Sequence, residues 1–252
     1  MALRRLVKSF VEDRGYQLRR KDPGDLAFEK TDGRAIFFLH IGKNAGSQIK
    51  RLTKQMERRA DSVFVALPHD RGFGSLPRGA RYFFSIRNPI TRFKSGFYSR
   101  MRKGAPRYDY EWSAHERAAF ERFEHANDLA EALFLDDESG IAACAAALSI
   151  THTAMHQVDW FSRAGFALEQ NPPIWIIRQE HFSQDFAKFL ERASLDLSLE
   201  DLDVSEDRAG AHKTNYSQTP DLSEAAIANL KRWYARDFEF YRQCEHWMQR
   251  NN

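Results

Sequence analysis

Short apolar runs alternate with longer amphipathic segments along most of this chain. Four runs have the length and composition of buried strands, at residues 35–39, 63–67, 81–86 and 174–177. Segments with the apolar spacing of helices lie between and after these runs, at residues 48–56, 89–99, 111–135, 139–150, 182–193 and 222–250. Strands that alternate with helices predict a parallel sheet that binds ligands at the carboxyl ends of its strands.

The first 34 residues are more polar than the rest of the chain. Turn signals at residues 22–25 and 31–33 predict a short helix and a hairpin there, or an extension that binds a partner. We therefore divide the chain into an N-terminal extension, residues 1–34, and an α/β domain, residues 35–252. The chain has 252 residues, of which 42% are hydrophobic, so one domain can bury a sizeable core. The predicted fold is a single α/β domain with a central parallel sheet flanked by helices.

The first apolar run turns abruptly into a small, basic loop, His-Ile-Gly-Lys-Asn-Ala-Gly-Ser at residues 40–47. The unpaired N–H groups and the dipole at the start of the following helix favour an anion there. Lys43 adds a full positive charge and Ser47 a hydroxyl. The lysine precedes the second glycine, unlike the lysine of the common nucleotide-binding loop. The loop predicts a site of phosphate size, and the alternative is an ordinary strand–turn–helix connection with an exposed lysine.

A second basic segment follows the run at residues 81–86. It reads Arg-Asn-Pro-Ile-Thr-Arg-Phe-Lys-Ser-Gly-Phe-Tyr at residues 87–98. Its Asn-Pro pair predicts a helix start, and the helix places Arg92, Ser95 and Ser99 on one face. The guanidinium at residue 87 matches a phosphate group in shape and charge. The segment predicts a second oxyanion site, with a surface helix bearing solvated arginines as the alternative.

Together, the two segments resemble the paired motifs of the sulfotransferases that use 3′-phosphoadenosine 5′-phosphosulfate (PAPS), particularly the carbohydrate sulfotransferase branch. Residues 40–47 are similar to that family's His-Ile-Pro-Lys-Thr-Ala-Gly-Thr-Ser-like loop, with Gly42, Asn44 and Ser47 in place of Pro, Thr and Thr. Residues 87–98 are similar to its Arg-Asp-Pro-x-x-Arg-x-x-Ser-x-Tyr-like segment, with one Asp replaced by Asn. The resemblance implies the P-loop-like sulfotransferase fold, with PAPS as the cofactor and sulfuryl donor.

The resemblance also assigns residues to the cofactor. The first loop would hold the 5′-phosphosulfate, and the second segment the 3′-phosphate. A late polar loop, residues 210–217, resembles the family's loop that closes over the nucleotide, with a merely exposed loop as the alternative. The implied cofactor-binding residues are Gly42, Lys43, Asn44, Ala45, Gly46, Ser47, Arg87, Ser95 and Lys213.

Sulfuryl transfer to a hydroxyl is an in-line displacement that depends on positioning and charge stabilisation. Lys43 is the candidate to stabilise charge on the departing phosphate, together with the N–H groups of residues 44–47. The acceptor hydroxyl needs a general base. We predict His69 as this base, because it follows an apolar run and its position resembles that of the catalytic His in uronyl-type sulfotransferases. A loop histidine without a catalytic role is the alternative, and His40 and Glu57 are weaker candidates.

A polar cluster at residues 151–160 contains two histidines four residues apart. Such a pair on a helix can bind a metal, but no third ligand is evident, so we expect no metal. The resembled family often has a His/Gln segment here that lines the acceptor cleft. The resemblance therefore implies that His156 and Gln157 contact the acceptor.

Charge and composition limit the classes of ligand and partner that we expect. The net charge of +3 suits anionic ligands but lacks the charge concentration of a nucleic-acid binder. The two cysteines form no metal or redox pattern and suggest a reduced compartment. No apolar run approaches the roughly 18 residues of a membrane span. We expect a cytoplasmic, bacterial-type protein. A basic group that would favour an acidic glycan, or is simply a solvated helix end, comprises Arg100, Arg102, Lys103 and Arg107.

The expected function is transfer of a sulfuryl group from PAPS to a hydroxyl, on a carbohydrate or glycoconjugate acceptor. One alternative is a nucleotide-dependent kinase, which the loop disfavours because its lysine is displaced and no acidic Mg²⁺-binding motif is obvious. Another is a non-catalytic module that binds the nucleotide without turnover, which the replacements at Gly42 and Asn44 favour. The sequence predicts neither the identity of the acceptor nor the oligomeric state.

Overall fold

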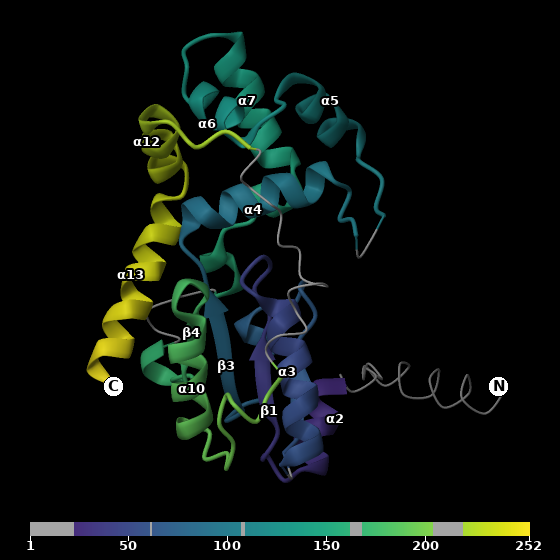
Figure 1. Cartoon of the computed structure of the whole chain (residues 1–252), viewed down its shortest axis with the longest axis vertical. Helices are drawn as coiled ribbons and strands as arrows, with labels where there is room; N and C mark the ends of the chain where they lie inside the picture. Colours follow the sequence, from purple (N-terminus) through teal and green to yellow (C-terminus); the bar gives the residue numbers. More distant parts are fainter. Residues whose placement is uncertain (1–22, 61, 107–108, 162–167, 204–218) are drawn as a thin grey trace, which may run out of the picture.

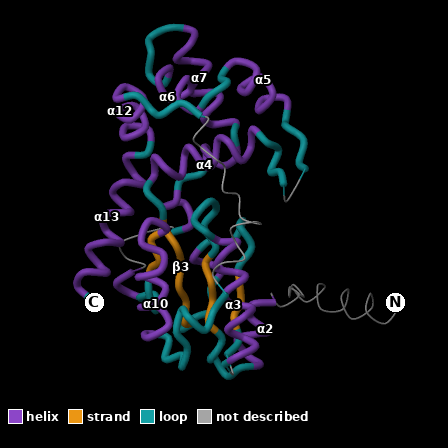
Figure 2. The backbone as a smooth tube through the Cα atoms, in the orientation of Figure 1, coloured by secondary structure: helices purple, strands orange, loops and turns teal. Residues whose placement is uncertain are grey.

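A four-stranded, all-parallel sheet forms the centre of the computed structural model, which describes residues 23–60, 62–106, 109–161, 168–203 and 219–252 (Figures 1 and 2). Its strands are β1 (Ile36–Leu39), β2 (Phe64–Ala66), β3 (Arg81–Ile86) and β4 (Ile176–Arg178), in the order β2-β1-β3-β4. The predicted α/β class with a central parallel sheet is therefore confirmed.

The two central strands are apolar because both of their faces are covered. In β3, Phe83 stacks on Phe189 of α10 (Phe182–Arg192), with ring centroids 4.2 Å apart. The next residue, Phe84, points to the opposite face, where it lies 6.3 Å from Phe240 of α13 (Ala235–Arg250). The two helices thus cover opposite faces of the sheet, as expected for a buried parallel strand.

The edge strand β4 begins two residues later than the sequence predicts. The N–H of Ile174 already donates to the carbonyl of Tyr82, at 2.7 Å, but the regular ladder with β3 begins at Ile176. The two prolines at positions 172 and 173 precede this contact and have no N–H to donate.

A second apolar cluster lies beyond the carboxyl ends of the strands, at the top of Figure 1. It is built by residues of α4 (Pro89–Met101), α5 (Ala114–Arg122), α6 (Ala126–Ala132), α7 (Glu138–Ser149) and α12 (Glu224–Trp233), and α8 (Thr151–Ala154) contacts α4 and α7. The short 3₁₀ helices are η1 (Phe73–Ser75), η2 (Gln157–Trp160) and η3 (Gln179–His181).

Two long segments that the sequence predicts to be helical each contain two helices. The prediction of one helix over residues 111–135 is wrong, because α5 ends at Arg122 and α6 begins at Ala126. The carboxylate of Asp128 accepts the N–H of His125, at 3.0 Å, which favours a new helix start there. Residues 222–250 likewise divide into α12 and α13, with a break at Tyr234.

The described end of the predicted extension contains a short helix, α2 (Pro23–Lys30), as in one of the two predictions for this segment. Pro23 occupies its first position, where the missing N–H costs no hydrogen bond. The turn at residues 31–33 ends this helix, and Gly33 has a φ of 78° that favours glycine. The described part of the extension, residues 23–34, contains no hairpin.

Candidate functional site

The four strands end at one edge of the sheet, and the loops that follow carry most of the predicted chemistry. After β1 comes the first basic loop, after β2 the segment with His69, after β3 the pair Arg87 and Asn88, and after β4 Glu180. The chain leaves β1 toward β2 and then crosses to β3 on the other side. The two basic loops therefore flank the switch point of the sheet, where open α/β folds bind ligands.

The first loop has an unusual backbone. Lys43 and Ala45 both adopt the left-handed conformation, with φ of 70° and 59°. Ala45 is also the N-cap of α3 (Gly46–Arg59), where no side chain caps the helix and no acidic residue lies in the first turn. Left-handed residues before a helix turn successive N–H groups toward one point, which forms an anion-binding concavity. The predicted anion site thus has the backbone it requires.

Gly46 gives this loop its shape, because a buried ring occupies the space where a side chain would begin. A Cβ at Gly46 would lie 1.8 Å from Nε2 of His40. The His40 ring stacks on Phe38 on β1, with centroids 5.2 Å apart. Burial lowers the pKa of His40 to about 2, with smaller effects from His69 and Lys50, so the ring is neutral. The neutral His40 ring therefore packs against the loop at Gly46, on the side of β1.

Lys43 lies among other cations. Burial is the main cause that lowers its pKa to about 8, and the positive charges of Arg87, Arg102 and Arg92 add to this effect. All the charges acting on Lys43 that shift its pKa are positive. An anion bound here would relieve their repulsion and favour the charged form of the lysine. The electrostatics of the site therefore favour an anionic ligand.

Asn44 points into the protein. Its side chain is fully buried, and Nδ2 donates to the carbonyl of Ser85, at 2.9 Å, and to Oε1 of Gln157, at 2.7 Å. The Ser85 hydroxyl in turn donates to the carbonyl of Asn44, at 2.5 Å. The side chain of Asn44 thus joins the loop to β3, and only its backbone N–H remains a candidate for the predicted cofactor contact.

Gln157 joins the two basic loops. Its Oε1 accepts the N–H of Arg87, at 2.9 Å, in addition to the bond from Asn44, and its Nε2 donates to the carbonyl of Arg87, at 2.7 Å. The side chain is fully buried. It could contact an acceptor only if both loops were rearranged, so the geometry assigns it a positioning role in place of the predicted acceptor contact.

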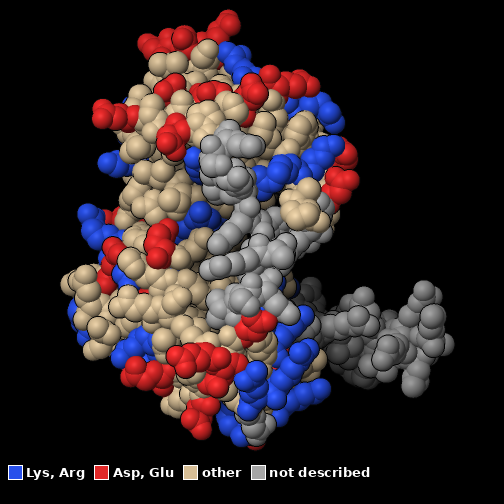
Figure 3. All heavy atoms as spheres, in the orientation of Figure 1, with Lys and Arg blue, Asp and Glu red and all other residues tan. Residues whose placement is uncertain are grey.

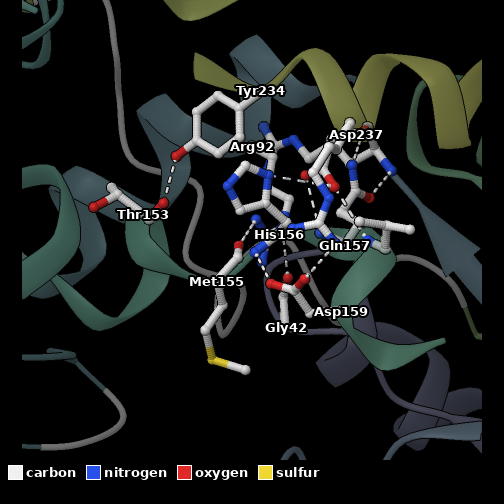
Figure 4. A network of polar contacts seen from close by, with 12 residues as sticks. Gly42, Arg92, Thr153, Met155, His156, Gln157, Asp159, Tyr234 and Asp237 are labelled. Carbon is white, nitrogen blue, oxygen red and sulfur yellow. Dashed lines mark hydrogen bonds and ion pairs between the residues drawn. The ribbon is translucent and has the colours of Figure 1, made fainter. Parts of the chain in front are cut away.

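A buried arginine and a buried aspartate form hydrogen bonds with the backbone of the first loop and of the segment that contains Gln157 (Figure 4). Arg92 donates from Nε to the carbonyl of Gly42, at 3.0 Å, and from Nη1 to the carbonyl of Met155, at 2.7 Å. The Asp237 carboxylate accepts the N–H groups of Gln157 and Val158, at 2.9 and 3.1 Å. Arg92 thus does not face a ligand; it fixes the first loop from within α4.

The side chain of His156, which was also predicted to contact the acceptor, points into the protein. Its ring packs against Tyr234, with centroids 5.2 Å apart, and its Nδ1 lies 3.9 Å from Oδ1 of Asp237 (Figure 4). The Tyr234 hydroxyl donates to the carbonyl of Thr153, at 2.6 Å. An Asp-Phe-x-x-Tyr pattern marks Asp237 in the sequence, but nothing there shows that its carboxylate reaches the first turn of η2.

Arg87, which follows β3, and Ser95, on α4, are both half-buried. Arg87 donates from Nε to the hydroxyl of Thr91, at 3.0 Å, and from Nη1 to the carbonyl of Lys43, at 3.4 Å. Glu180 accepts the N–H of Asn88, at 2.9 Å, and the Thr91 hydroxyl, at 3.2 Å. The guanidinium therefore lies beside the first loop.

His69 is exposed and lies against the first loop. The N–H of Leu67 donates to the carbonyl of Phe38, at 2.9 Å, which extends the pairing of β2 with β1 toward His69. The His69 and His40 ring centroids are 3.7 Å apart, and a Cβ at Gly42 would lie 3.8 Å from Nδ1 of His69. Desolvation, followed by the charge of Lys50, lowers the pKa of His69. The ring is therefore neutral at neutral pH, which a general base requires.

A further histidine, His152, belongs to the same cluster. Burial lowers its pKa to about 3, and the charges of Lys43, Arg92, Arg100 and His69 contribute. The sequence suggests His152 only as half of a metal pair. In the described part of the chain, no group of three or more His, Cys, Asp or Glu side chains could hold a metal ion. His152 is thus a neutral neighbour of the anion site.

Other predicted residues lie away from the site or outside the described part. Arg100 forms a buried pair with Glu116, at 2.7 Å, and Lys103 pairs with Glu111, at 2.8 Å. The charges of these two cations are paired with carboxylates, which does not favour the alternative that they bind an acidic glycan. Lys213 and Arg107 lie outside the described residues.

Comparisons with known proteins add no assignment. No protein-family model matches the chain, and no curated protein sequence matches it significantly. Among the helices that the structure describes, none has the length and apolar character to cross a membrane.

Proposed function

We propose that this protein transfers a sulfuryl group from PAPS to a hydroxyl of a carbohydrate or glycoconjugate. The observation that carries the proposal is the meeting of two basic loops at the switch point of a parallel sheet, where Lys43 and Arg87 lie side by side. The two motifs that resemble those of the sulfotransferases supply these two residues. On this proposal the sheet belongs to the P-loop-like sulfotransferase fold, and the protein works in the cytoplasm.

The donor would be held through its two charged ends. The 5′-phosphosulfate binds the N–H groups at the start of α3, and Lys43 stabilises the negative charge that develops on the departing phosphate. The 3′-phosphate binds Arg87, with Ser95 on the next helix as a second candidate. Gln157, Asn44 and their buried partners keep the two loops at a fixed separation, which an in-line displacement requires.

His69 would act as the general base toward the acceptor hydroxyl. It is exposed to solvent, neutral at neutral pH and adjacent to the loop that would hold the sulfuryl group. When the acceptor oxygen attacks sulfur, its proton passes to the imidazole, and the sulfur–oxygen bond to the phosphate breaks. The products are a sulfate ester and adenosine 3′,5′-bisphosphate.

Transfer of labelled sulfate from PAPS to a panel of glycans, in EDTA, tests the proposal. We expect His69→Ala to lower the rate about 10²–10⁴-fold, the usual contribution of a general base, with little effect on nucleotide binding. His115→Ala, which removes an exposed histidine of α5, is the matched control. Nucleotide binding without transfer to any acceptor would favour the non-catalytic module, and ATP-dependent phosphorylation that EDTA abolishes would favour the kinase.

A further inference from the structure

Helix α7 presents an apolar face to solvent. Its inner side chains, Ala143, Ala146 and Ala147, are buried, and the helix packs against α5, α6 and α8. On the outer face, Ile141 is 73% exposed and Leu148 is 64% exposed. Figure 1 shows α7 at the end of the molecule that lies away from the sheet. A helix that is apolar on all sides is normally buried on all sides, so this outer face has the character of an interface.

Exposed apolar side chains are concentrated on this helix and on the loop before it. Among the residues that the structure describes, eight large apolar side chains are exposed, of which four lie between residues 134 and 148. Besides Ile141 and Leu148, they are Phe134 and Leu135. Single exposed apolar residues are normal on a protein surface, whereas a group of them marks a binding surface.

The outer face of α7 is complementary to itself. Ile141 and Leu148 are seven residues apart, so they lie on one side of the helix, about 10 Å apart along its axis. Between them lies Ala145, which is exposed and leaves a shallow depression. Two copies packed antiparallel would place Ile141 of one protomer against the partner's Leu148, and the reverse. A two-fold dimer requires a surface of this kind.

The start of α7 is acidic. Asp136, Asp137 and Glu138 are consecutive and exposed. The cation beside them is Arg122 of α5, which donates to the hydroxyl of Ser139, at 3.1 Å. Three carboxylates and one cation leave this end of the helix with a net negative charge. Figure 3 shows Asp and Glu side chains gathered at the same end of the molecule.

The end of α7 lies beside a cation. The carboxylate of Glu116, in the first turn of α5, accepts the N–H of Thr151, which follows α7. The next residue of α5, Arg117, is exposed. Its charge also acts on Glu111, but that carboxylate is paired with Lys103, at 2.8 Å. Arg117 therefore makes this end net positive.

These charges select one arrangement of two copies. In an antiparallel pair, the acidic start of each α7 would face Arg117 beside the end of the partner's helix, and the two-fold axis would repeat this contact. A parallel pair would bring the two acidic starts together, and like charges that face each other across an interface oppose association. Shape and charge thus favour the same antiparallel pair.

The same charges disfavour a membrane as the occupant. Helices that lie on membranes border their apolar face with cations, which anionic lipids attract. The start of α7 carries carboxylates in that place, and anionic lipids would repel them. A second copy of the chain accommodates both the apolar face and its two charged ends.

We propose that α7 is the contact surface of a two-fold dimer of this chain, with the two helices antiparallel and Ala145 near the axis. The inference does not rest on the proposed function, because none of the candidate site residues belongs to α7. The helix is about 18 Å long. Since an interface of this length is small, we expect a weak dimer that forms as the protein concentration rises.

Sedimentation velocity over about a hundredfold range of protein concentration tests the inference. We expect the wild type to pass from monomer to dimer. Ile141→Gln/Leu148→Gln should raise the dissociation constant of the dimer about tenfold or more, because it removes the central apolar contacts. Leu26→Gln/Val63→Gln is the matched control, since it changes two exposed apolar residues away from α7 and should leave the constant unchanged.

A charge exchange tests the antiparallel arrangement. Glu138→Lys and Arg117→Glu should each weaken the dimer, because each places like charges in contact. The double variant Glu138→Lys/Arg117→Glu should restore the affinity of the wild type. Loss of stability cannot produce this recovery, because the double variant carries both substitutions. Thermal unfolding in dilute solution checks that every variant keeps its fold.

Four results would overturn the inference. They are a wild type that stays monomeric throughout, equal dissociation constants for the wild type and Ile141→Gln/Leu148→Gln, an equal loss of affinity in the Leu26→Gln/Val63→Gln control, and no recovery in the charge-exchanged variant. A monomeric wild type that binds phosphatidylcholine vesicles would assign the face to a membrane and would likewise refute the dimer.

Discussion

Replacing Gly46 by alanine should damage both the stability of the protein and its anion site. At a helical position with ordinary backbone angles, Gly→Ala usually stabilises a protein by about 0.4–1 kcal/mol, because it restricts the unfolded chain. Gly46 should show the opposite sign. A Cβ there would lie 1.8, 2.2 and 2.9 Å from three atoms of the His40 ring, whereas carbon atoms in contact prefer about 3.5–4.0 Å.

Neither partner in this conflict can move freely. The His40 ring lies between Phe38 and His69, with centroids 5.2 and 3.7 Å away. The start of α3 is held because the apolar side chains of the helix are fully buried. Overpacking of this kind costs about 1–3 kcal/mol. For a chain of this size each kcal/mol lowers Tm by about 2–4 °C, so we expect a decrease of about 2–12 °C.

Calorimetry of Gly46→Ala measures both consequences. Displacement of the first N–H groups of α3 should also weaken adenosine 3′,5′-bisphosphate binding about tenfold or more. Gly74→Ala is the matched control, because a Cβ at Gly74 would have no heavy atom within 4 Å. Removal of the ring in Gly46→Ala/His40→Ala should recover part of the stability, as a positive coupling of about 0.5–3 kcal/mol. A Gly46→Ala protein as stable as the wild type, with unchanged nucleotide affinity, would refute this reasoning.

Two further predictions concern pH and the joint between the loops. Burial lowers the pKa of Lys43 to about 8 in the folded protein. Nucleotide affinity should therefore decrease as pH rises through about 8, because the lysine loses its charge. In titrations from pH 7 to 9, Lys43→Arg should remove this dependence. The unfolded chain retains the Lys43 proton up to about pH 10.5, so this group should raise stability as pH rises from about 8 to 10.5; a fall attributable to Lys43 over that window would contradict the assigned burial. Gln157→Leu removes the hydrogen bonds from its amide to the N–H and carbonyl of Arg87, at about 1–3 kcal/mol each, and should lower both Tm and nucleotide affinity. Gln170→Leu, at an exposed position, is the control, and equal effects of the two changes would contradict the positioning role of Gln157.

The strands and the loop after β1 could be predicted from the sequence because their signals are local. A mostly apolar run of this length, such as residues 81–86, indicates a buried strand, and β3 has those bounds. The loop at residues 40–47 combines small residues with a cation immediately before an amphipathic segment. Its left-handed residues, Lys43 and Ala45, were not predicted, since neither is glycine.

The buried framework could not be predicted, because its bonds join residues far apart in the chain. Gln157 is 113 residues from Asn44 and 70 from Arg87. The family resemblance implied an acceptor contact for Gln157, and only the fold shows that its amide forms hydrogen bonds with the backbone of Arg87. Arg92 was predicted on the ligand face, yet it is buried behind the first loop.

The helix boundaries could not be predicted where capping competes with apolar periodicity. The predicted helix over residues 111–135 keeps its apolar spacing through the break, but the carboxylate of Asp128 stabilises a new start there. At Tyr234, between α12 and α13, the side chain makes a tertiary contact, in which its hydroxyl donates to the carbonyl of Thr153. The apolar periodicity of the sequence indicates neither contact.

The most direct test of the central claim is isothermal titration of the protein with adenosine 3′,5′-bisphosphate in the presence of EDTA. The account predicts saturable binding of one nucleotide per chain, weakened about tenfold or more by Lys43→Gln and by Arg87→Gln, because each change removes a positive charge from the site of one of the two phosphate groups. Absence of binding to the wild type, or equal affinities for the wild type and both variants, would contradict the account.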